Sequence, residues 1–246
     1  MGELAAWFDE LLVPGRFSDY CPNGLQVEGR HRIRKLACGV TASLGLIEAA
    51  AAANADALLV HHGWFWRGED ARLTGIKGAR VRALIESGMH LFAFHLPLDV
   101  HPEVGNNAML GARLGWPVTG CGGQDGLIVW HDFQKPRSTA ALSAAITRAL
   151  SRKPLAVGRL DRPIRRMAWC TGAAQDMIET AAALGADAYL SGEISERTTH
   201  LARELGISYF AAGHHATERF GIQALTARAA GVFGFSHSFI DDPNPV

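Results

Sequence analysis

The chain has 246 residues, enough to bury a substantial core without disulfides or metal. Its 24 Lys and Arg residues balance 24 Asp and Glu residues, so no net field would attract nucleic acid, an anionic membrane or a strongly charged substrate. A small polar ligand fits this balance better, while an acidic N-terminus, no apolar run of about 18 residues and four scattered cysteines favour a soluble protein of the reducing cytoplasm.

The chain contains an internal repeat. Residues 34–63 align without a gap onto residues 165–194, and twelve of the thirty positions are identical. Each copy has the pattern of a strand, an alanine-rich helix and a second strand, which predicts crossover units and a mainly parallel sheet. In chain order the predicted elements are 35–40, 43–53 and 57–60 in the first copy, and 166–171, 174–184 and 188–191 in the second.

The similarity resumes downstream, where residues 83–99 and 202–218 each read as a helix, a glycine and a strand. We therefore expect two duplicated α/β halves with a metal site in the cleft between them. The glycine-rich segment 120–126 is expected to be the seam, which gives subdomains of residues 1–124 and 125–246. The C-terminal segment would either pack back on the first subdomain or form a loose tail.

Polar side chains gather just after the apolar strands. In open α/β sheets, ligands bind beyond the carboxyl ends of the strands. Imidazole and carboxylate groups suit zinc, iron, manganese or nickel, and their number here exceeds what one tetrahedral ion needs. The sequence therefore predicts two divalent metal ions that share a bridging carboxylate. The candidate residues are His61, His62, His95, Asp99, Glu193, His214 and Glu218.

Each candidate ligand also has an ordinary structural explanation. His61 and His62 follow an apolar strand, where adjacent side chains face opposite ways, and hydrogen bonds alone could satisfy them. His214 and Glu218 share one face of a helical turn, but such pairs are common on solvated helices. Asp99 follows a proline that is expected to end the strand and leave the carboxylate in a loop. The recurrence of these signals at equivalent ends of the two repeats favours the metal site.

Other residues have alternative interpretations. His95 and Glu193 are candidate catalytic groups that would move a proton, although Glu193 could equally orient a metal ligand or cap a helix. Trp64 and Trp66 could stack on a substrate ring, pack in the core or lie at a subunit interface. Asn106 lies in a turn-like Gly-Asn-Asn sequence, to which we assign no catalytic role.

Five motifs surround these residues: PNGLQV (22–27), VHHGWFWRGE (60–69), HLPLDVHPEVGNN (95–107), SGEISE (191–196) and GHHATER (213–219). In this order, and over nearly the whole chain, they resemble the Nif-three-like family, whose members are known as GTP cyclohydrolase I type 2 homologues and include the bacterial YbgI proteins. The resemblance implies a dinuclear metal centre, with His95 close by, and a ring-shaped homohexamer. It implies as metal ligands His61, His62, Asp99, His214 and Glu218.

These patterns lead to two hypotheses of different classes. In the first, the protein is a metal-dependent hydrolase that acts on a small polar, nucleotide-like molecule. In the second, it is a non-catalytic metal-binding ring or an adaptor for a partner protein. A serine hydrolase is not favoured, because the chain has no Gly-x-Ser-x-Gly motif, and the two-copy repeat argues against an eight-stranded barrel.

Overall fold

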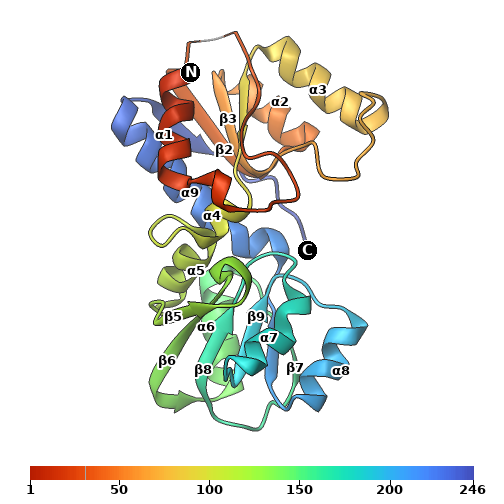
Figure 1. Cartoon of the computed structure of the whole chain (residues 1–246), viewed down its shortest axis with the longest axis vertical. Coiled ribbons are helices and arrows are strands. Elements are labelled where there is room, and N and C mark those ends of the chain that lie inside the picture. Colours follow the sequence, from red (N-terminus) through yellow and green to blue (C-terminus); the bar gives the residue numbers. More distant parts are fainter. Residues whose placement is uncertain (31) are drawn as a thin grey trace. The chain divides into compact units, whose positions relative to one another are not determined.

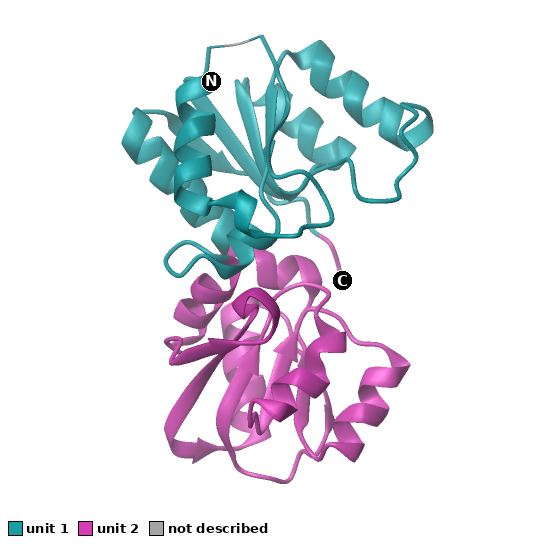
Figure 2. Ribbon diagram, viewed as in Figure 1, with its two compact units in different colours: residues 1–105, 221–243 teal, residues 106–220, 244–246 magenta. Residues whose placement is uncertain are grey.

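The chain folds into two α/β units, each with its own sheet (Figures 1 and 2). The computed structural model describes residues 1–30 and 32–246. Unit 1 comprises residues 1–105 and 221–243, whereas unit 2 comprises residues 106–220 and 244–246. The duplicated α/β fold expected from the repeat is therefore confirmed.

The break between the units differs from the expected seam at residues 124 and 125. The glycine-rich segment lies inside unit 2, where it forms strand β5 (Gly120–Gly122) and the 3-10 turn η2 (Gln124–Gly126). β5 pairs antiparallel with β6 (Ile128–Arg137), and the positive φ angles of Gly123 and Gly126 allow the tight connection between the two strands. The glycines serve a turn within one unit, not a linker between two.

Unit 1 is built on a five-stranded sheet in the order β1-β4-β3-β2-β11. β2, β3, β4 and β11 run parallel, and β1 is an antiparallel edge strand. The strands are β1 (Gly24–Val27), β2 (Lys35–Thr41), β3 (Ala57–His62), β4 (His90–Ala93) and β11 (Ser236–Phe239). The helices are α1 (Gly2–Leu12), α2 (Leu44–Ala52), α3 (Gly75–Ser87) and α4 (Leu96–Val100), with a 3-10 turn η1 (Pro14–Arg16) and the later part of α9 (His214–Phe233).

Helices cover both faces of this sheet. Alternate residues of β3 point to opposite faces and pack against different helices. Leu59 packs with residues of α1 and α9 in one apolar cluster, and Leu58 and Val60 pack with residues of α2 and α3 in another (Figure 1). A strand covered on both faces needs a continuous apolar run, and β3 has one until its last two residues. The two histidines at the end of the run are therefore the first polar side chains on this strand.

Unit 2 has a six-stranded sheet in the order β5-β6-β8-β9-β10-β7. β8, β9 and β10 are parallel, as the repeat predicts, but β5, β6 and β7 join by antiparallel pairs, so this sheet is mixed and not mainly parallel. Its further strands are β7 (Leu155–Gly158), β8 (Ile164–Trp169), β9 (Ala188–Ser191) and β10 (Ser208–Ala211). Its helices are α5 (Asn106–Leu114), α6 (Thr139–Leu150), α7 (Ile178–Ala183) and α8 (Glu196–Glu204), with a 3-10 turn η3 (Gln175–Met177) and the start of α9.

The residues shared by the two repeats have the same structural task in each unit. Oδ2 of Asp56 accepts hydrogen bonds from the backbone N–H groups of Arg34 and Lys35, at 2.8 and 2.9 Å. Oδ2 of Asp187 accepts the equivalent bonds from Arg165 and Arg166 at the same two distances. Each aspartate therefore ties the start of one strand to the start of the next, which explains why the Ala-Asp-Ala sequence occurs twice.

Replacing either aspartate with alanine is expected to lower the free energy of unfolding by a similar amount, about 1.5–3 kcal/mol. Each change leaves two backbone N–H groups without their carboxylate acceptor. Urea denaturation of Asp56→Ala and Asp187→Ala, beside the exposed control Asp161→Ala, would measure the effect. If the free energy of unfolding falls no more than in the control, the hydrogen bonds of these two aspartates do not stabilise the fold.

The C-terminal segment returns to unit 1. β11 pairs with β2, the Ile240 N–H bonds the Cys38 carbonyl at 2.8 Å, and the Asp242 carboxylate accepts from the Ser43 hydroxyl. The segment from Asp241 onwards has no regular secondary structure, but these contacts show that it is not the loose tail that its composition indicates.

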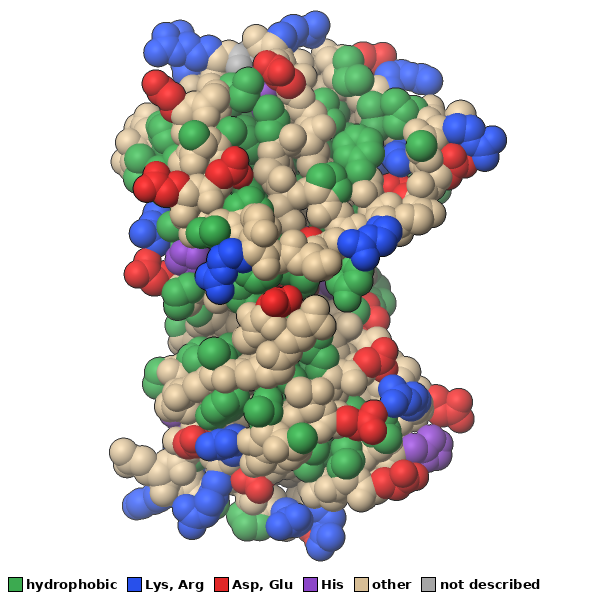
Figure 3. Space-filling model, in the orientation of Figure 1, with side chains coloured by type: hydrophobic (Ala, Val, Ile, Leu, Met, Phe, Trp, Pro, Cys, Tyr) green, Lys and Arg blue, Asp and Glu red, His purple; other side chains and the backbone are tan. Residues whose placement is uncertain are grey.

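The surface agrees with the balanced composition. On the face drawn in Figure 3, acidic and basic side chains are interspersed and neither sign dominates. Among residues 1–30 and 32–246, no helix combines the length and apolar character that crossing a membrane requires.

Candidate metal centre

The candidate ligands of unit 1 lie where its central strands end. His61 and His62 are the last residues of β3, and His95 follows β4. The imidazole centroids of His61 and His62 are 4.5 Å apart, and those of His61 and His95 are 5.1 Å apart. The neighbouring rings of the doublet therefore lie side by side, although strand geometry predicts that they diverge. The three histidines offer ring nitrogens within 4.8 Å of one another, a spacing that could hold a metal ion.

The fixed orientation of His61 points one nitrogen toward a carboxylate. The residue is fully buried, and its Nδ1 lies 2.8 Å from the backbone oxygen of Phe94, which places the ring proton on Nδ1. Its Nε2 lies 3.4 Å from Oδ1 of Asp99. A buried carboxylate normally needs a charged or hydrogen-bonding partner, and Asp99 is 5% exposed. His61 and Asp99 together therefore present one nitrogen and one oxygen donor to the same point.

Asp99 belongs to a short helix, not to a loop as expected. Pro97 occupies the first turn of α4, where its fixed φ angle is compatible with a helix and its missing N–H costs nothing. The proline therefore starts a helical turn, and this turn carries the Asp99 carboxylate inward.

The orientation of His95 is set by a carboxylate that the sequence did not reveal as important. Nδ1 of His95 lies 2.7 Å from Oδ1 of Asp19. Oδ2 of Asp19 accepts from the Asn23 amide at 2.8 Å and from the Leu96 N–H at 3.0 Å. Burial raises the pKa of Asp19, but the hydrogen bonds from His95 and Asn23 outweigh it and bring the pKa to about 2. Asp19 is therefore ionised at neutral pH and holds the imidazole in one orientation.

Cys21 also lies near this pair, and its sulfur completes a group with Asp19 and His95 that could hold a metal. Burial, aided by the charge of Asp19, raises the pKa of the Cys21 thiol to about 12. Because the thiolate is the form that binds metal, a thiol held protonated is a poor ligand. We do not assign Cys21 to the centre.

In unit 2, His214 and Glu218 lie in the first turns of α9. Nε2 of His214 is 3.1 Å from Oε2 of Glu218, four residues on, and Glu218 is 3% exposed. Nδ1 of His214 is 2.7 Å from Oε1 of Glu193. Burial opposes the charged form of His214, but the Glu218 and Glu193 carboxylates outweigh it and raise the pKa of His214 to about 9.

Glu193 therefore contacts a candidate ligand through the nitrogen that faces away from Glu218. Of the roles considered for this residue, orientation of His214 fits the hydrogen bond better than proton transfer to a substrate. Gly172 leaves room for the Glu218 carboxylate, because a Cβ atom at this position would lie 2.1 Å from Oε1 of Glu218.

One arrangement recurs in the four candidate histidines His61, His62, His95 and His214. In each, Nδ1 contacts an oxygen atom of the protein, and Nε2 is the ring nitrogen that points away from this contact. For His62 this oxygen is Oγ1 of Thr41, at 3.0 Å. The Nδ1 partners of the four rings are Phe94 for His61, Thr41 for His62, Asp19 for His95 and Glu193 for His214. Histidines that bind metal through Nε2 usually have this second interaction, because it fixes the tautomer and the ring.

The aromatic residues after the doublet divide between core and site. Trp64 is 3% exposed, packs in the core beside α2 and donates to the Ala42 carbonyl at 3.1 Å. Trp66 stands edge-on to His95, with ring centroids 5.1 Å apart. Of the two tryptophans, Trp66 is therefore the one that could contact a substrate.

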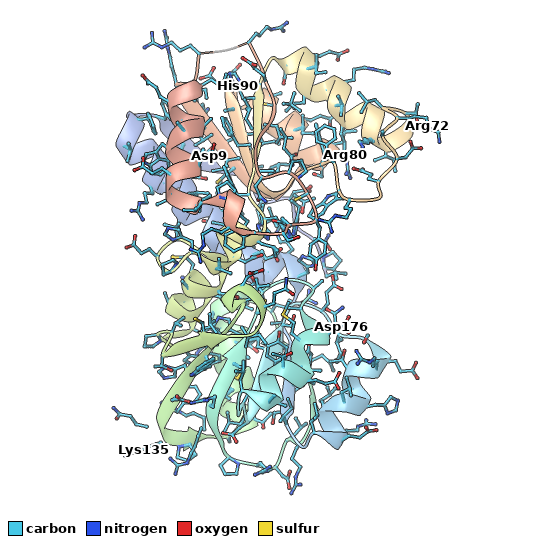
Figure 4. The ribbon with its side chains drawn as sticks, in the orientation of Figure 1. Asp9, Arg72, Arg80, His90, Lys135 and Asp176 are labelled. Carbon is cyan, nitrogen blue, oxygen red and sulfur yellow. The ribbon has the colours of Figure 1, made fainter. Side chains whose placement is uncertain are left out.

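Two further polar residues, Asn106 and His90, have structural roles. Asn106 is fully buried at the start of α5, and its neighbour Asn107 accepts from the Thr171 N–H at 3.0 Å, so this segment is no exposed turn. His90, labelled in Figure 4, begins β4 at the opposite end of the strand from His95, and it accepts a hydrogen bond from the Gly29 N–H at 2.9 Å.

The fold and these side chains define a class: α/β proteins of two related units with imidazole and carboxylate groups suited to divalent metals. The chain belongs to the Duf34/NIF3 (NGG1p interacting factor 3) family, whose model matches residues 1–245. The resemblance drawn from the five motifs is confirmed.

Relatives of high identity cover almost the whole chain. It is 52% identical to the "GTP cyclohydrolase 1 type 2 homolog" of Allochromatium vinosum, over 99% of this chain and 96% of the relative. It is 50% identical to the protein of the same name from Vibrio cholerae, over 99% and 98%. Among solved structures, "protein ybgI, unknown function" has a TM-score of 0.95 at 45% identity and covers 100% of this chain and 99% of that one. The Thermus thermophilus protein TTHA1606 has a TM-score of 0.89 at 30% identity, over 100% and 99%.

Proposed function

We propose that this protein is a dinuclear, metal-dependent hydrolase of a small polar substrate. The proposal rests on the paired orientation of the histidines: Nδ1 is held by the protein, and in His61 and His214 Nε2 faces a buried carboxylate. The proposed ligands are His61, His62 and Asp99 of unit 1 together with His214 and Glu218 of unit 2.

The donor set fits divalent metal ions. Buried carboxylates favour a nearby positive charge, and imidazole nitrogens next to them select zinc, iron, manganese or nickel over calcium or magnesium. Such ions, when bound, supply Lewis acidity and make water a stronger acid.

Around these ligands, the chain's own residues would handle the proton and the substrate. His95, held by the ionised Asp19, is positioned to take or give a proton at Nε2. Trp66, edge-on to His95, would contact a planar group of the substrate. The name of the relatives, GTP cyclohydrolase 1 type 2 homolog, is consistent with a nucleotide-like substrate.

Elemental analysis tests this proposal. Protein purified without added metal or chelator is expected to contain about two transition-metal ions per chain, as two-metal hydrolytic sites do. Variants that lack both His61 and Glu218 should contain none. A chain that binds no metal after dialysis against zinc, iron or manganese would refute the proposed centre.

Replacing Asp19 with asparagine is expected to separate catalysis from metal binding. The change keeps the shape of the residue but removes the charge that orients His95, and a comparable loss in serine proteases lowers turnover about 10⁴-fold. We expect a fall of about 10²–10⁴-fold in hydrolysis of the best substrate from nucleotide, cyclic amide and phosphoester panels, with the metal content unchanged. Asp9→Asn, on an exposed face of α1, is the matched control.

The alternative is a metal-binding ring or adaptor without catalysis, for which the oriented Asp19–His95 pair would have no use. If metal-loaded protein is inert across these panels and Asp19→Asn changes nothing, the adaptor is the better explanation. The homohexameric ring that the resemblance implies and the cytoplasmic location that the sequence favours stay predictions.

A further inference from the structure

One residue of the PNGLQV motif, Gln26, lies at an irregular point of the edge strand β1. Leu25 lies opposite Phe92 of β4, and Val27 lies opposite Leu91. Gln26, between them, is therefore the extra residue of a β-bulge. Bulges are common at sheet edges and beside functional sites, where they turn one side chain in a new direction.

The amide of Gln26 pairs with a peptide group just beyond the histidine doublet of β3. Its Oε1 accepts from the Trp64 N–H at 2.8 Å, and its Nε2 donates to the Trp64 carbonyl at 3.1 Å. Nε2 is also 2.8 Å from the Pro22 carbonyl. With two carbonyls beside Nε2 and one N–H beside Oε1, only this orientation of the amide satisfies all three contacts. The side chain therefore binds both polar groups of one residue, as the backbone of a neighbouring strand would.

This pairing takes the place of a strand that has ended. The ladder between β3 and β4 ends with Val60 opposite Ala93, two residues before the end of β3. On its other side, β3 is paired with β2 as far as His62, whose carbonyl accepts from the Ala42 N–H at 2.8 Å. Gln26 therefore supplies hydrogen bonds to the chain after His62 on the side where β4 has turned away.

The close approach of Gln26 explains the glycine between His62 and Trp64. A Cβ atom at Gly63 would lie 2.2 Å from Oε1 of Gln26 and 2.5 Å from the Cβ atom of Ala93. Without a side chain at position 63, the amide can reach the backbone directly after the doublet.

A second polar side chain of the motif holds the backbone after the neighbouring strand β4. Oδ1 of Asn23 accepts from the His95 N–H at 2.7 Å. Asn23 and Gln26 therefore fix the two segments that follow β3 and β4, and both segments carry candidate residues of the metal centre.

We propose that Gln26 is the positioning residue of the His61–His62 doublet, and that it fixes the direction in which His62 meets a metal ion. His61 is fully buried, whereas His62 is partly exposed. The direction of a partly exposed ring depends more strongly on the backbone from which it extends. Metal sites need their ligands held to within about 0.5 Å, which surrounding residues must ensure. The inference deepens the proposed function and rests on it, because it takes His62 as a ligand.

The variant Gln26→Met tests this role, because it keeps the length of the side chain and removes both hydrogen bonds to Trp64. We expect the affinity for one of the two proposed ions to fall about tenfold, the lower end of the effect of residues that orient metal ligands. Competition with a chromogenic chelator would measure this fall. The absorption bands of cobalt-loaded protein should also shift, because they depend on the geometry of the ligands.

Asp56→Ala is the matched control. It also removes two hydrogen bonds to backbone N–H groups, but at the starts of β2 and β3, the opposite end from His62. It should lower the stability to urea by an amount similar to that of Gln26→Met, and leave the metal affinity and the cobalt bands unchanged. Equal effects of the two variants on metal would mean that Gln26 acts only through general stability, and would overturn the inference.

Gln26→Asn provides a second variant in case Gln26→Met does not fold. It keeps the amide, but the side chain is one methylene too short to reach Trp64, so the same loss of metal affinity is expected. Parent-like affinity and cobalt bands in a folded Gln26 variant would also overturn the inference.

Nitrogen NMR spectra of the imidazoles in metal-free protein keep this inference distinct from the proposed function. The ring signals of His62, assigned with His62→Ala, should move in Gln26→Met and stay in place in Asp56→Ala. If the parent protein binds no metal, the proposed function fails, but these signals still decide whether Gln26 positions the doublet. Signals that stay in place in both variants would refute that role, even in a protein that binds two ions.

Discussion

Glu218→Gln protein is expected to lose at least one of the two proposed metal ions, with the affinity for the remaining metal reduced at least about 100-fold. The substitution keeps the size of a side chain that is 3% exposed, but it replaces a charged oxygen donor by a neutral amide, a much weaker ligand for a divalent cation. It also removes the carboxylate that faces Nε2 of His214 at 3.1 Å. Elemental analysis and competition with a chromogenic chelator would measure the loss.

Glu196→Gln is the matched control, because Glu196 is an exposed residue in the first turn of α8. It should bind metal like the parent protein. If Glu218→Gln also binds two ions with unchanged affinity, Glu218 is not a ligand. Size-exclusion chromatography of the same variant, and of His62→Ala, would separate the two functional hypotheses: an enzyme should keep its assembly and lose turnover, whereas a scaffold held by metal should lose its assembly.

Gly172→Ala is expected to remove metal as effectively as loss of the ligand itself. A Cβ atom at this position would lie 2.1 Å from Oε1 of Glu218 and 3.2 Å from Nε2 of His214, so both side chains must move. The backbone is also strained by any side chain there, since its φ is +68°. We expect the loss of at least one of the two proposed metal ions, and a free energy of unfolding lower by more than about 2 kcal/mol, from strain and displaced buried groups together.

Gly206→Ala separates these two causes. Gly206 has almost the same φ, +69°, but a Cβ atom there would meet nothing within 4 Å. The free energy of unfolding of this variant should fall only by the cost of backbone strain, about 1–2 kcal/mol, and its metal content should not change. The pair can be compared by urea denaturation and elemental analysis. Equal metal content in both variants would show that the close approach of Gly172 to Glu218 does not matter for the centre.

The repeat made much of the fold predictable. Within each copy, apolar runs and alanine-rich segments have clear periods, and the predicted strand, helix and strand fall within a few residues of β2, α2 and β3 and of their counterparts in unit 2. The sequence does not predict the antiparallel strands β5, β6 and β7 of the second sheet. Their direction depends on the path by which the chain returns to the sheet. That path depends on contacts such as the pairing of β10 with β7, which no local pattern reveals.

The site was predictable where a histidine or carboxylate follows an apolar strand, as for His61. It was not predictable for Asp19, which lies in an irregular segment, has no counterpart in the repeat and meets His95 across 76 positions of sequence. The only signal was its closeness to the PNGLQV motif, whose Asn23 bonds both Asp19 and the His95 N–H. Pro97 misled for a different reason: proline both ends strands and begins helices, and only the tertiary structure decides between these roles.

The order of strands in unit 1 has a consequence for biosynthesis. Residues 106–220 are one uninterrupted insertion, and they supply every strand of the second sheet, whereas the first sheet takes its edge strand β11 from residues 236–239. Domains tend to fold as they emerge during translation. Unit 2 can therefore fold while the sheet of unit 1 still has an unpaired edge at β2. The last-made strand therefore closes the earliest-made sheet, and a nascent chain stalled before residue 236 would expose that edge to pairing with other chains.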